Sequence, residues 1–130
     1  MKTGDSFEVW DVVTEKNTAA SLGSGALDVF GTPFLAAMME NAAFTLMQRS
    51  LPEGKSIVGV SLEIAHVSPS PIGMRIRAVA EVASISENGK FAEFKVTAYD
   101  DAGLIGEGTH RRAVITVDRF MSKCLAKLAQ

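Results

Sequence analysis

The sequence has few of the residues that build disulfides and metal sites. Among 130 residues it holds one cysteine, Cys124, and two histidines, His66 and His110. A single cysteine cannot form an internal disulfide, which suits the reducing conditions of the cytoplasm. No set of cysteines and histidines has the spacing of metal ligands. We therefore expect a cytoplasmic protein with no bound metal.

The chain also lacks a surplus of positive charge and a long apolar segment. Thirteen basic residues face fifteen acidic ones, and the net charge is −2. Binding to a phosphate backbone needs a basic face, so we expect no nucleic-acid partner. The longest apolar run extends from about Pro33 to Met39, whereas a membrane-spanning helix needs about 20 residues. The acidic residues near the N-terminus do not suit a secretory signal, so we expect no membrane association.

Apolar residues nevertheless make up 47% of the chain, which is typical of a globular protein, and the length suits one domain over residues 1–130. Thr32-Pro33 predicts the start of a helix that runs to about Ser50, because threonine is a favoured N-cap and proline a favoured first helical residue. This helix is apolar on nearly every side, as buried helices are. The remaining predicted elements are a lid or loop with one helical turn at 14–31, strands at 6–13, 56–67, 74–86, 90–99 and 104–117, and a helix at 118–128.

Short links, among them the hairpin signal Asn88-Gly89, predict that the last four strands are antiparallel neighbours in chain order. A strand, a buried helix, four antiparallel strands and a short helix make up an α+β hotdog fold, in which a five-stranded antiparallel sheet wraps a long central helix. One such sheet leaves part of an all-round apolar helix uncovered. A second copy would cover it, so we expect a homodimer.

Glu40 is the only charged side chain between Asp28 and Arg49, and it lies in the middle of the apolar helix. A carboxylate buried there has to be paired or to have its pKa raised. Either state suits acid–base or nucleophilic chemistry. The alternative is that Glu40 belongs to a narrow exposed stripe with Asn41, Thr45 and Gln48. The sequence leaves both interpretations open.

His66 is the second candidate, because it stands on the apolar face of its predicted strand. Alternation gives that face the residues Val58, Val60, Leu62, Ile64 and His66. If the face lies against the helix, the imidazole could reach the Glu40 carboxylate and tune both pKa values. The alternative is a buried histidine bonded to a backbone carbonyl.

Thr32 is the third candidate, although capping alone would explain it. A helix start presents free N–H groups that can hold a carbonyl oxygen as it becomes an oxyanion, so Gly31 and Thr32 could polarise a substrate carbonyl while the hydroxyl orients or acts as a nucleophile. Glu40 lies eight residues later, about 12 Å along the axis. The two cannot act on one carbonyl carbon within one chain. In a dimer with antiparallel helices they can meet, which predicts a site at the subunit interface.

Four segments together carry a resemblance to a known family: Gly31-Thr32-Pro33, LAAMMENAA, IVGVSLEIAHVSPSPIGM and GEGTHRRAVI. From about Val12 to Phe120 the chain resembles the fluoroacetyl-CoA thioesterase-like branch of the hotdog superfamily. The family's catalytic threonine, glutamate and histidine match Thr32, Glu40 and His66 at the same intervals of 8 and 26 residues. A family glycine matches Gly59.

The resemblance implies hydrolysis of an acyl-CoA thioester, with coenzyme A entering as part of the substrate and no separate cofactor. Thr32 would position or attack the carbonyl, and Glu40 would act as nucleophile or general base. His66 would relay a proton and help to activate water. Gly59 would leave room for a small acyl group.

The chain departs from the family in its lid, which is several residues shorter. Ala26 replaces an aromatic gate that confers selectivity for fluorinated acyl groups, while Val29 and Phe30 remain close by. We therefore expect a thioesterase for another short or medium acyl-CoA. The expected substrate contacts are Val29, Phe30, Gly31, Gly59 and Arg112, the last meeting a CoA phosphate or pairing with an acid. The alternative is a non-catalytic hotdog protein that binds an acyl group or another small ligand.

Overall fold

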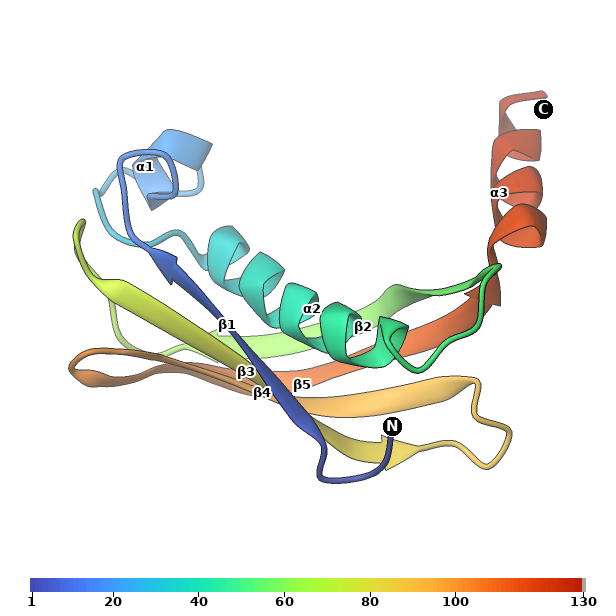
Figure 1. Cartoon of the computed structure of the whole chain (residues 1–130). Helices are drawn as coiled ribbons and strands as arrows, with labels where there is room; N and C mark the ends of the chain where they lie inside the picture. The colour runs from blue at the N-terminus through green and yellow to red at the C-terminus, as the bar shows by residue number, and fades with distance from the viewer. Residues whose placement is uncertain (130) are drawn as a thin grey trace.

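The computed structural model describes residues 1–129, and at its centre one long helix lies across a five-stranded antiparallel sheet (Figure 1). The strands are β1 (Ser6–Val12), β2 (Lys55–His66), β3 (Arg75–Ile85), β4 (Phe91–Asp100) and β5 (Gly103–Thr116). The helices are α1 (Ala19–Leu22), α2 (Thr32–Gln48), α3 (Val117–Leu125) and the short 3-10 helix η1 (Ala126–Ala129). The predicted helices and strands are confirmed, with ends shifted by a few residues.

The strands follow the order β1-β3-β4-β5-β2 across the sheet. The hairpins β3–β4 and β4–β5 are confirmed, but β2 pairs with β5 and not with β3. The prediction that the four strands are neighbours in chain order is therefore wrong at this link. The connection 67–74 contains Pro69 and Pro71, which have no N–H to continue a hairpin ladder. It carries the chain across the sheet instead and leaves β2 as an edge strand.

A β-bulge divides β2 into two parts. Its register with β5 shifts after Gly59, where Val60 is the extra residue. Such a bulge changes the side on which the following side chains stand. Gly59 faces α2 before the bulge, and Leu62, Ile64 and His66 line the same side after it. The prediction that Val58 and Val60 share the face of His66 is therefore wrong, since Val58 alternates with Gly59 and Val60 is 53% exposed.

Helix α2 buries one side against the sheet and leaves another side open in the protomer. Its buried residues are Leu35, Met38, Met39, Ala42, Ala43, Leu46 and Met47. A second stripe faces β2 and consists of Thr32, Ala36, Glu40, Phe44 and Gln48, four residues apart. The expectation of a helix apolar on nearly every side is therefore too broad, because this second stripe carries polar groups.

Gly31, and not Thr32, is the N-cap of α2. Thr32 is already helical, and no side chain caps the helix start. A Cβ on Gly31 would lie 3.1 Å from Phe34 Cδ2 and 3.3 Å from the backbone of Thr18, so the close approach of the lid favours glycine. The prediction that Thr32 caps the helix is wrong, and its hydroxyl is free to face β2.

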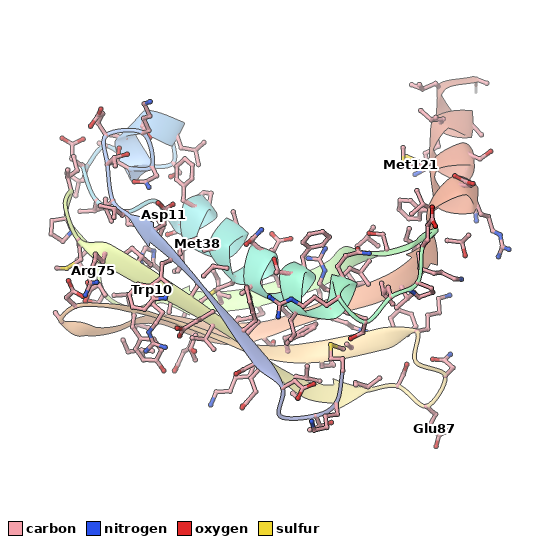
Figure 2. The ribbon with its side chains drawn as sticks, viewed as in Figure 1. Trp10, Asp11, Met38, Arg75, Glu87 and Met121 are labelled. Atoms are coloured by element: carbon pink, nitrogen blue, oxygen red, sulfur yellow. The ribbon has the colours of Figure 1, made fainter. Side chains whose placement is uncertain are left out.

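Helices α1 and α3 rise at opposite ends of the sheet, on the side where α2 lies (Figure 1). Helix α3 has no buried residue, and Met121, 44% exposed, stands clear of the sheet (Figure 2). On the β1 edge, the Arg75 guanidinium lies 5.5 Å from the Trp10 ring centroid, and both are labelled in Figure 2. Within residues 1–129, no helix is long and apolar enough to cross a membrane.

Candidate active site

Thr32 and His66 come together at the start of α2. Thr32 Oγ1 lies 2.8 Å from His66 Nδ1. The first residue of α2 and the last residue of β2 thus meet across 34 residues of sequence. The helix start adds the Thr32 N–H and partial positive charge beside the hydroxyl.

His66 is held in its neutral form. Burial lowers the pKa of its imidazole below the usual 6.5, and the backbone of Ser68 partly opposes this shift. Its Nε2 is buried and has no hydrogen-bond partner among the described residues. Unpaired buried polar atoms are uncommon, and catalytic sites are one place where they occur. A neutral imidazole bonded to a hydroxyl can take up its proton.

A pocket of about 580 Å³ opens beside this pair. Thr32 and His66 share its wall with apolar residues of the lid, α2 and the strand end: Val29, Phe30, Ala36, Leu62, Ile64 and Val67. The volume is that of a small-molecule site, and the apolar wall suits an acyl group. Val29 and Phe30 thus lie where a substrate contact was expected, whereas Ala26 is exposed and does not line the pocket.

The backbone N–H of Gly31 is already in use. It donates to the Asn17 carbonyl at 3.0 Å, so the prediction that this N–H polarises a substrate carbonyl is wrong. The N–H of Thr32 belongs to the first helical residue and has no acceptor within the helix. It is therefore the backbone donor that the helix start offers to a ligand.

Glu40 lies farther along α2, against the middle of β2 and β5. Its Oε2 is 3.8 Å from Arg112 Nη1, and a Cβ on Gly59 would lie 3.3 Å from the same oxygen. The Glu40 side chain is 44% exposed, while that of Arg112 is 9% exposed. Gly59 therefore leaves room for the carboxylate, and within one protomer it does not line the acyl pocket. Of the two roles expected for Arg112, the structure has it near an acid.

His110, which the sequence alone does not single out, completes this cluster. Its Nδ1 lies 2.8 Å from the Ser61 carbonyl, and its Nε2 lies 3.2 Å from Arg112 Nη1. A carbonyl can only accept, so Nδ1 carries the proton and Nε2 accepts from the guanidinium. Arg112 also donates to the Ile57 carbonyl at 3.3 Å. The signal that could have found His110 is its place two residues before Arg112, on the same face of a strand.

Burial controls the charge states in this cluster. Burial lowers the pKa of His110, the Ser61 backbone opposes this, Arg112 lowers it further, and Glu40 opposes. Burial also lowers the pKa of Arg112, with the Glu40 carboxylate acting in the opposite direction. Guanidinium groups stay charged in proteins, so the cluster holds a neutral imidazole between a cation and a backbone carbonyl.

The two halves of the site do not meet within one protomer. Thr32 and Glu40 are eight residues apart on one helix, about 12 Å along its axis. His66 pairs with Thr32, so the prediction that it reaches Glu40 of its own chain is wrong. The reason is that His66 ends β2, whereas Glu40 lies against Gly59 in its middle. Over residues 1–129, no cluster of histidine, cysteine and acidic residues is suited to hold a metal ion.

Comparison with known proteins identifies the family. The family model described as FlK, fluoroacetyl-CoA-specific thioesterase, matches residues 13–118. The chain belongs to the FlK family. This family is part of the hotdog thioesterase superfamily, so the resemblance expected from the four sequence segments is confirmed.

Individual FlK proteins show the same likeness. The fluoroacetyl-CoA thioesterase of Streptantibioticus cattleyicolor is 33% identical over 100 residues, which make up 77% of this chain and 70% of that protein. A solved structure of fluoroacetyl-CoA thioesterase FlK has a TM-score of 0.90 and 30% identity over 98% of this chain and 97% of that one. A FlK variant crystallised with fluoroacetate and CoA has a TM-score of 0.86 and 31% identity over 92% and 99%. The α+β hotdog arrangement of helix and sheet is thereby confirmed.

Proposed function

We propose that this FlK-family protein hydrolyses the thioester of a short or medium acyl-CoA to a free acid and CoA. The observation that carries the proposal is the Thr32–His66 hydrogen bond of 2.8 Å on the wall of an apolar pocket, at a helix start. A free N–H can polarise a thioester carbonyl, and a hydroxyl bonded to a neutral base can relay a proton. The lid lacks an aromatic gate at Ala26, which supports an acyl group other than fluoroacetyl.

A second copy of the chain supplies the other half of the site in this proposal. β2 is an edge strand of twelve residues, and edges of that length are usually covered in proteins. Beside it, Val60 is 53% exposed and Phe44 of the α2 stripe is 37% exposed. Antiparallel pairing of two β2 strands would join both sheets and set both α2 helices antiparallel on one side.

One register of that pairing completes the catalytic set. It places His66 opposite Gly59 of the partner subunit. Because Glu40 lies against Gly59 in each copy, the Glu40 carboxylate of one copy then reaches Thr32 and His66 of the other. The spacing that separates Thr32 and Glu40 in one chain is what makes a shared site necessary.

Each residue has a defined task in this shared site. The Thr32 N–H holds the carbonyl oxygen while Val29 and Phe30 contact the acyl group. Glu40 acts on the carbonyl carbon, as the nucleophile or as the base that takes a proton from water. When the C–S bond breaks, the CoA thiolate takes a proton from His66, and His66 takes the Thr32 hydroxyl proton in its place. The attacking water supplies the proton that returns to Thr32, either through Glu40 acting as base or on cleavage of an acyl–Glu40 anhydride.

Arg112 acts through Glu40 and not on the substrate in this proposal. It stands 3.8 Å from the carboxylate and is itself fixed by His110 and the Ile57 carbonyl. Gly59 likewise serves the carboxylate, because any side chain there would press on it. The helix start at Gly31 positions Thr32 without donating to the substrate.

The direct test is release of free CoA across acyl chain lengths, compared between the wild type and Glu40→Gln. We expect turnover of short or medium acyl-CoA and a fall of roughly 10²- to 10⁴-fold in the variant, the usual effect of removing an acid–base group. The matched control is Glu81→Gln, which removes an exposed carboxylate on the far face of β3. An unchanged rate in Glu40→Gln would defeat the site. Stabilisation by acyl-CoA without turnover would favour the non-catalytic binder.

The shared site has its own test. Thr32→Ala chains and Glu40→Ala chains carry different tags and are purified as heterodimers. One of the two sites then keeps both residues, so about half of the wild-type activity per dimer should return. True heterodimers without any recovered activity would show that the two residues do not act together across the interface.

A further inference from the structure

The molecule has a second pocket that the proposed reaction leaves unused. Its volume is about 510 Å³, and it lies among the turn from β3 to β4, the start of β2, the end of β5 and α3. Four basic side chains and no acidic one line it, together with an amide and an aromatic ring: Lys55, Lys90, Arg119, Lys123, Asn88 and Phe120. We call this the basic pocket.

The charge of the basic pocket is local. The whole chain has more acidic than basic residues, fifteen against thirteen, so four cations around one hollow do not follow from composition. Among residues 1–129, none of the four forms a salt bridge. Lys55 Nζ donates to Thr116 Oγ1 at 2.8 Å and keeps further N–H groups for a ligand. Cations gathered without acids repel one another, and a multiply charged anion between them relieves that repulsion.

The aromatic ring of the basic pocket indicates which kind of anion the pocket would bind. Phe120 is 39% exposed beside Arg119. Aromatic side chains stack nucleobases, and basic side chains beside them hold the phosphates. Phosphates joined to a nucleobase therefore fit this pocket better than a simple inorganic anion.

We infer that the basic pocket binds the phosphorylated adenosine end of CoA while the thioester lies in the Thr32–His66 pocket of the partner subunit. This inference rests on the proposed thioesterase function and on its dimer. It adds a second substrate subsite, far from the reacting carbonyl, and gives α3 a role that its lack of buried side chains does not otherwise explain.

The two pockets of one chain are too far apart to share one CoA. Lys55 and His66 stand at opposite ends of β2, eleven residues or about 36 Å apart, beyond the reach of the pantetheine arm. In Figure 1, α3 and the lid with α1 rise at opposite ends of the sheet. Only a chain that runs antiparallel to the first can bring the two kinds of pocket together.

The β2–β2 register proposed above does bring them together. With His66 opposite the partner's Gly59, Lys55 of the partner subunit lies four residues farther along, about 13 Å from His66. The Thr32–His66 pocket extends in that direction, since Val67, Ser68 and Pro69 line it. Lys55 and Ile57 alternate onto the face that packs against α2, so both pockets open on the same side of the joined sheet.

The experiment compares two thioesters of one acyl group, acyl-CoA and the nucleotide-free N-acetylcysteamine thioester. The variant Arg119→Gln/Lys123→Gln removes two cations from an exposed helix. We expect its KM for acyl-CoA to rise roughly tenfold or more, the effect of two lost charge-assisted contacts, with kcat unchanged. Its kcat/KM for the nucleotide-free thioester should equal that of the wild type. The control Lys16→Gln/Lys95→Gln removes the same charge elsewhere and should change neither.

Equal losses on both thioesters, or an unchanged KM for acyl-CoA, would overturn the inference. Competition adds a second readout: adenosine 3′,5′-bisphosphate should inhibit acyl-CoA hydrolysis by the wild type and inhibit the variant far less. If inorganic phosphate inhibits equally well at equal concentration, the pocket is a general anion site and the nucleotide assignment fails.

Heterodimers test whether the subsite acts across the interface. Thr32→Ala silences one site, and the Arg119→Gln/Lys123→Gln change is placed either in that same chain or in its partner. The surviving site should have a raised KM only when the change lies in the Thr32→Ala chain, which is the partner of the surviving Thr32. The opposite pattern would overturn the assignment.

The outcomes also separate this inference from the proposed function. If no acyl-CoA is hydrolysed, binding of CoA to the wild type and to the Arg119→Gln/Lys123→Gln variant is measured by calorimetry. Weaker binding in the variant alone would uphold the subsite while the thioesterase proposal fails. Hydrolysis with equal KM values would uphold the thioesterase and reject the subsite.

Discussion

Thr32 and His66 meet through one hydrogen bond between uncharged groups beside an open pocket, whereas Glu40 lies against a guanidinium that an imidazole and a backbone carbonyl hold in place. In the first half of the site, the first residue of α2 meets the last residue of β2. The second half is built in the middle of β2 and β5. The two halves therefore differ in charge, burial and in how many contacts fix them.

This difference assigns different work to the two halves. Thr32 and His66 are joined by one hydrogen bond at the pocket wall, so the proton between them can move when substrate binds. Loss of this hydrogen bond leaves the core intact. A charged cluster anchored to backbone carbonyls keeps one carboxylate in place at the cost of burying a cation, and its loss disturbs packing. Substitutions at Thr32 or His66 should therefore lower activity and leave stability nearly unchanged. Substitutions in the cluster around Glu40 and Arg112 should lower both.

The largest expected effect comes from Thr32→Ala. Loss of the hydroxyl should lower kcat by roughly 10²- to 10⁴-fold, because the proton path to His66 is removed. Thr32→Ser keeps the hydroxyl and should retain most of the activity. Steady-state CoA release measures both variants.

The same substitution separates catalysis from capping. An N-cap change to alanine typically costs about 1 kcal/mol, but Gly31 is the cap here. We therefore expect the urea-unfolding free energy of Thr32→Ala to match the wild type within about 0.5 kcal/mol. A clear loss of stability together with intact activity would reverse the roles given to this residue.

The next effect is on stability, in the charged half. Arg112→Met should lower the free energy of unfolding by about 1–3 kcal/mol, since it leaves the Glu40 carboxylate and His110 Nε2 without the guanidinium. Arg111→Met is the matched control on the opposite face of the same strand, where the arginine lies over Phe91 and near Glu93. Because Arg111 is only half-buried, its loss should stay within about 1 kcal/mol. Equal losses of unfolding free energy in both variants would show that burial of Arg112 does not increase its contribution to stability.

A smaller effect should follow from Gly59→Ala. The added Cβ would lie 3.3 Å from Glu40 Oε2 and 3.5 Å from His110 Cε1, so the carboxylate must move by a few tenths of an ångström. Small displacements of a reacting group lower kcat, and we expect roughly a tenfold fall. The free energy of unfolding should change by less than about 1 kcal/mol. Unchanged kcat would mean that the carboxylate position is not critical.

Sequence reasoning reached the parts of this molecule that follow from local pattern. Alternation and the Asn88-Gly89 signal predicted the β3–β4 hairpin, and apolar spacing predicted α2. The place of β2 was not predictable, because the 67–74 connection decides which strand it joins and strand propensity does not. The bulge at Val60 was hidden for the same reason: it exists only in the pairing with β5.

The candidate site shows the same limit. Charge scarcity singled out Glu40. The partner of His66 depends on where the helix and the strand end. The sequence predicts Glu40 as that partner, whereas the structure pairs His66 with Thr32. The role of His110 depends on a carbonyl 49 residues away, Ser61, which no spacing rule connects to it.

The smallest effect compares the two histidines through pH. Burial lowers the pKa of both His66 and His110 in the folded protein, so below about pH 6.5 the unfolded chain binds more protons than the folded one. Stability is then complete above that pH and falls as the solution becomes more acidic, by at most about 1.4 kcal/mol per pH unit for each proton. His110 is 1% exposed and lies beside a cation, so His110→Asn should flatten the curve more than His66→Asn. Urea unfolding from pH 8 to pH 5 measures the slopes. If His66 contributes more than His110 to the pH dependence of the unfolding free energy, then protonation is opposed more strongly beside Thr32 than beside Arg112.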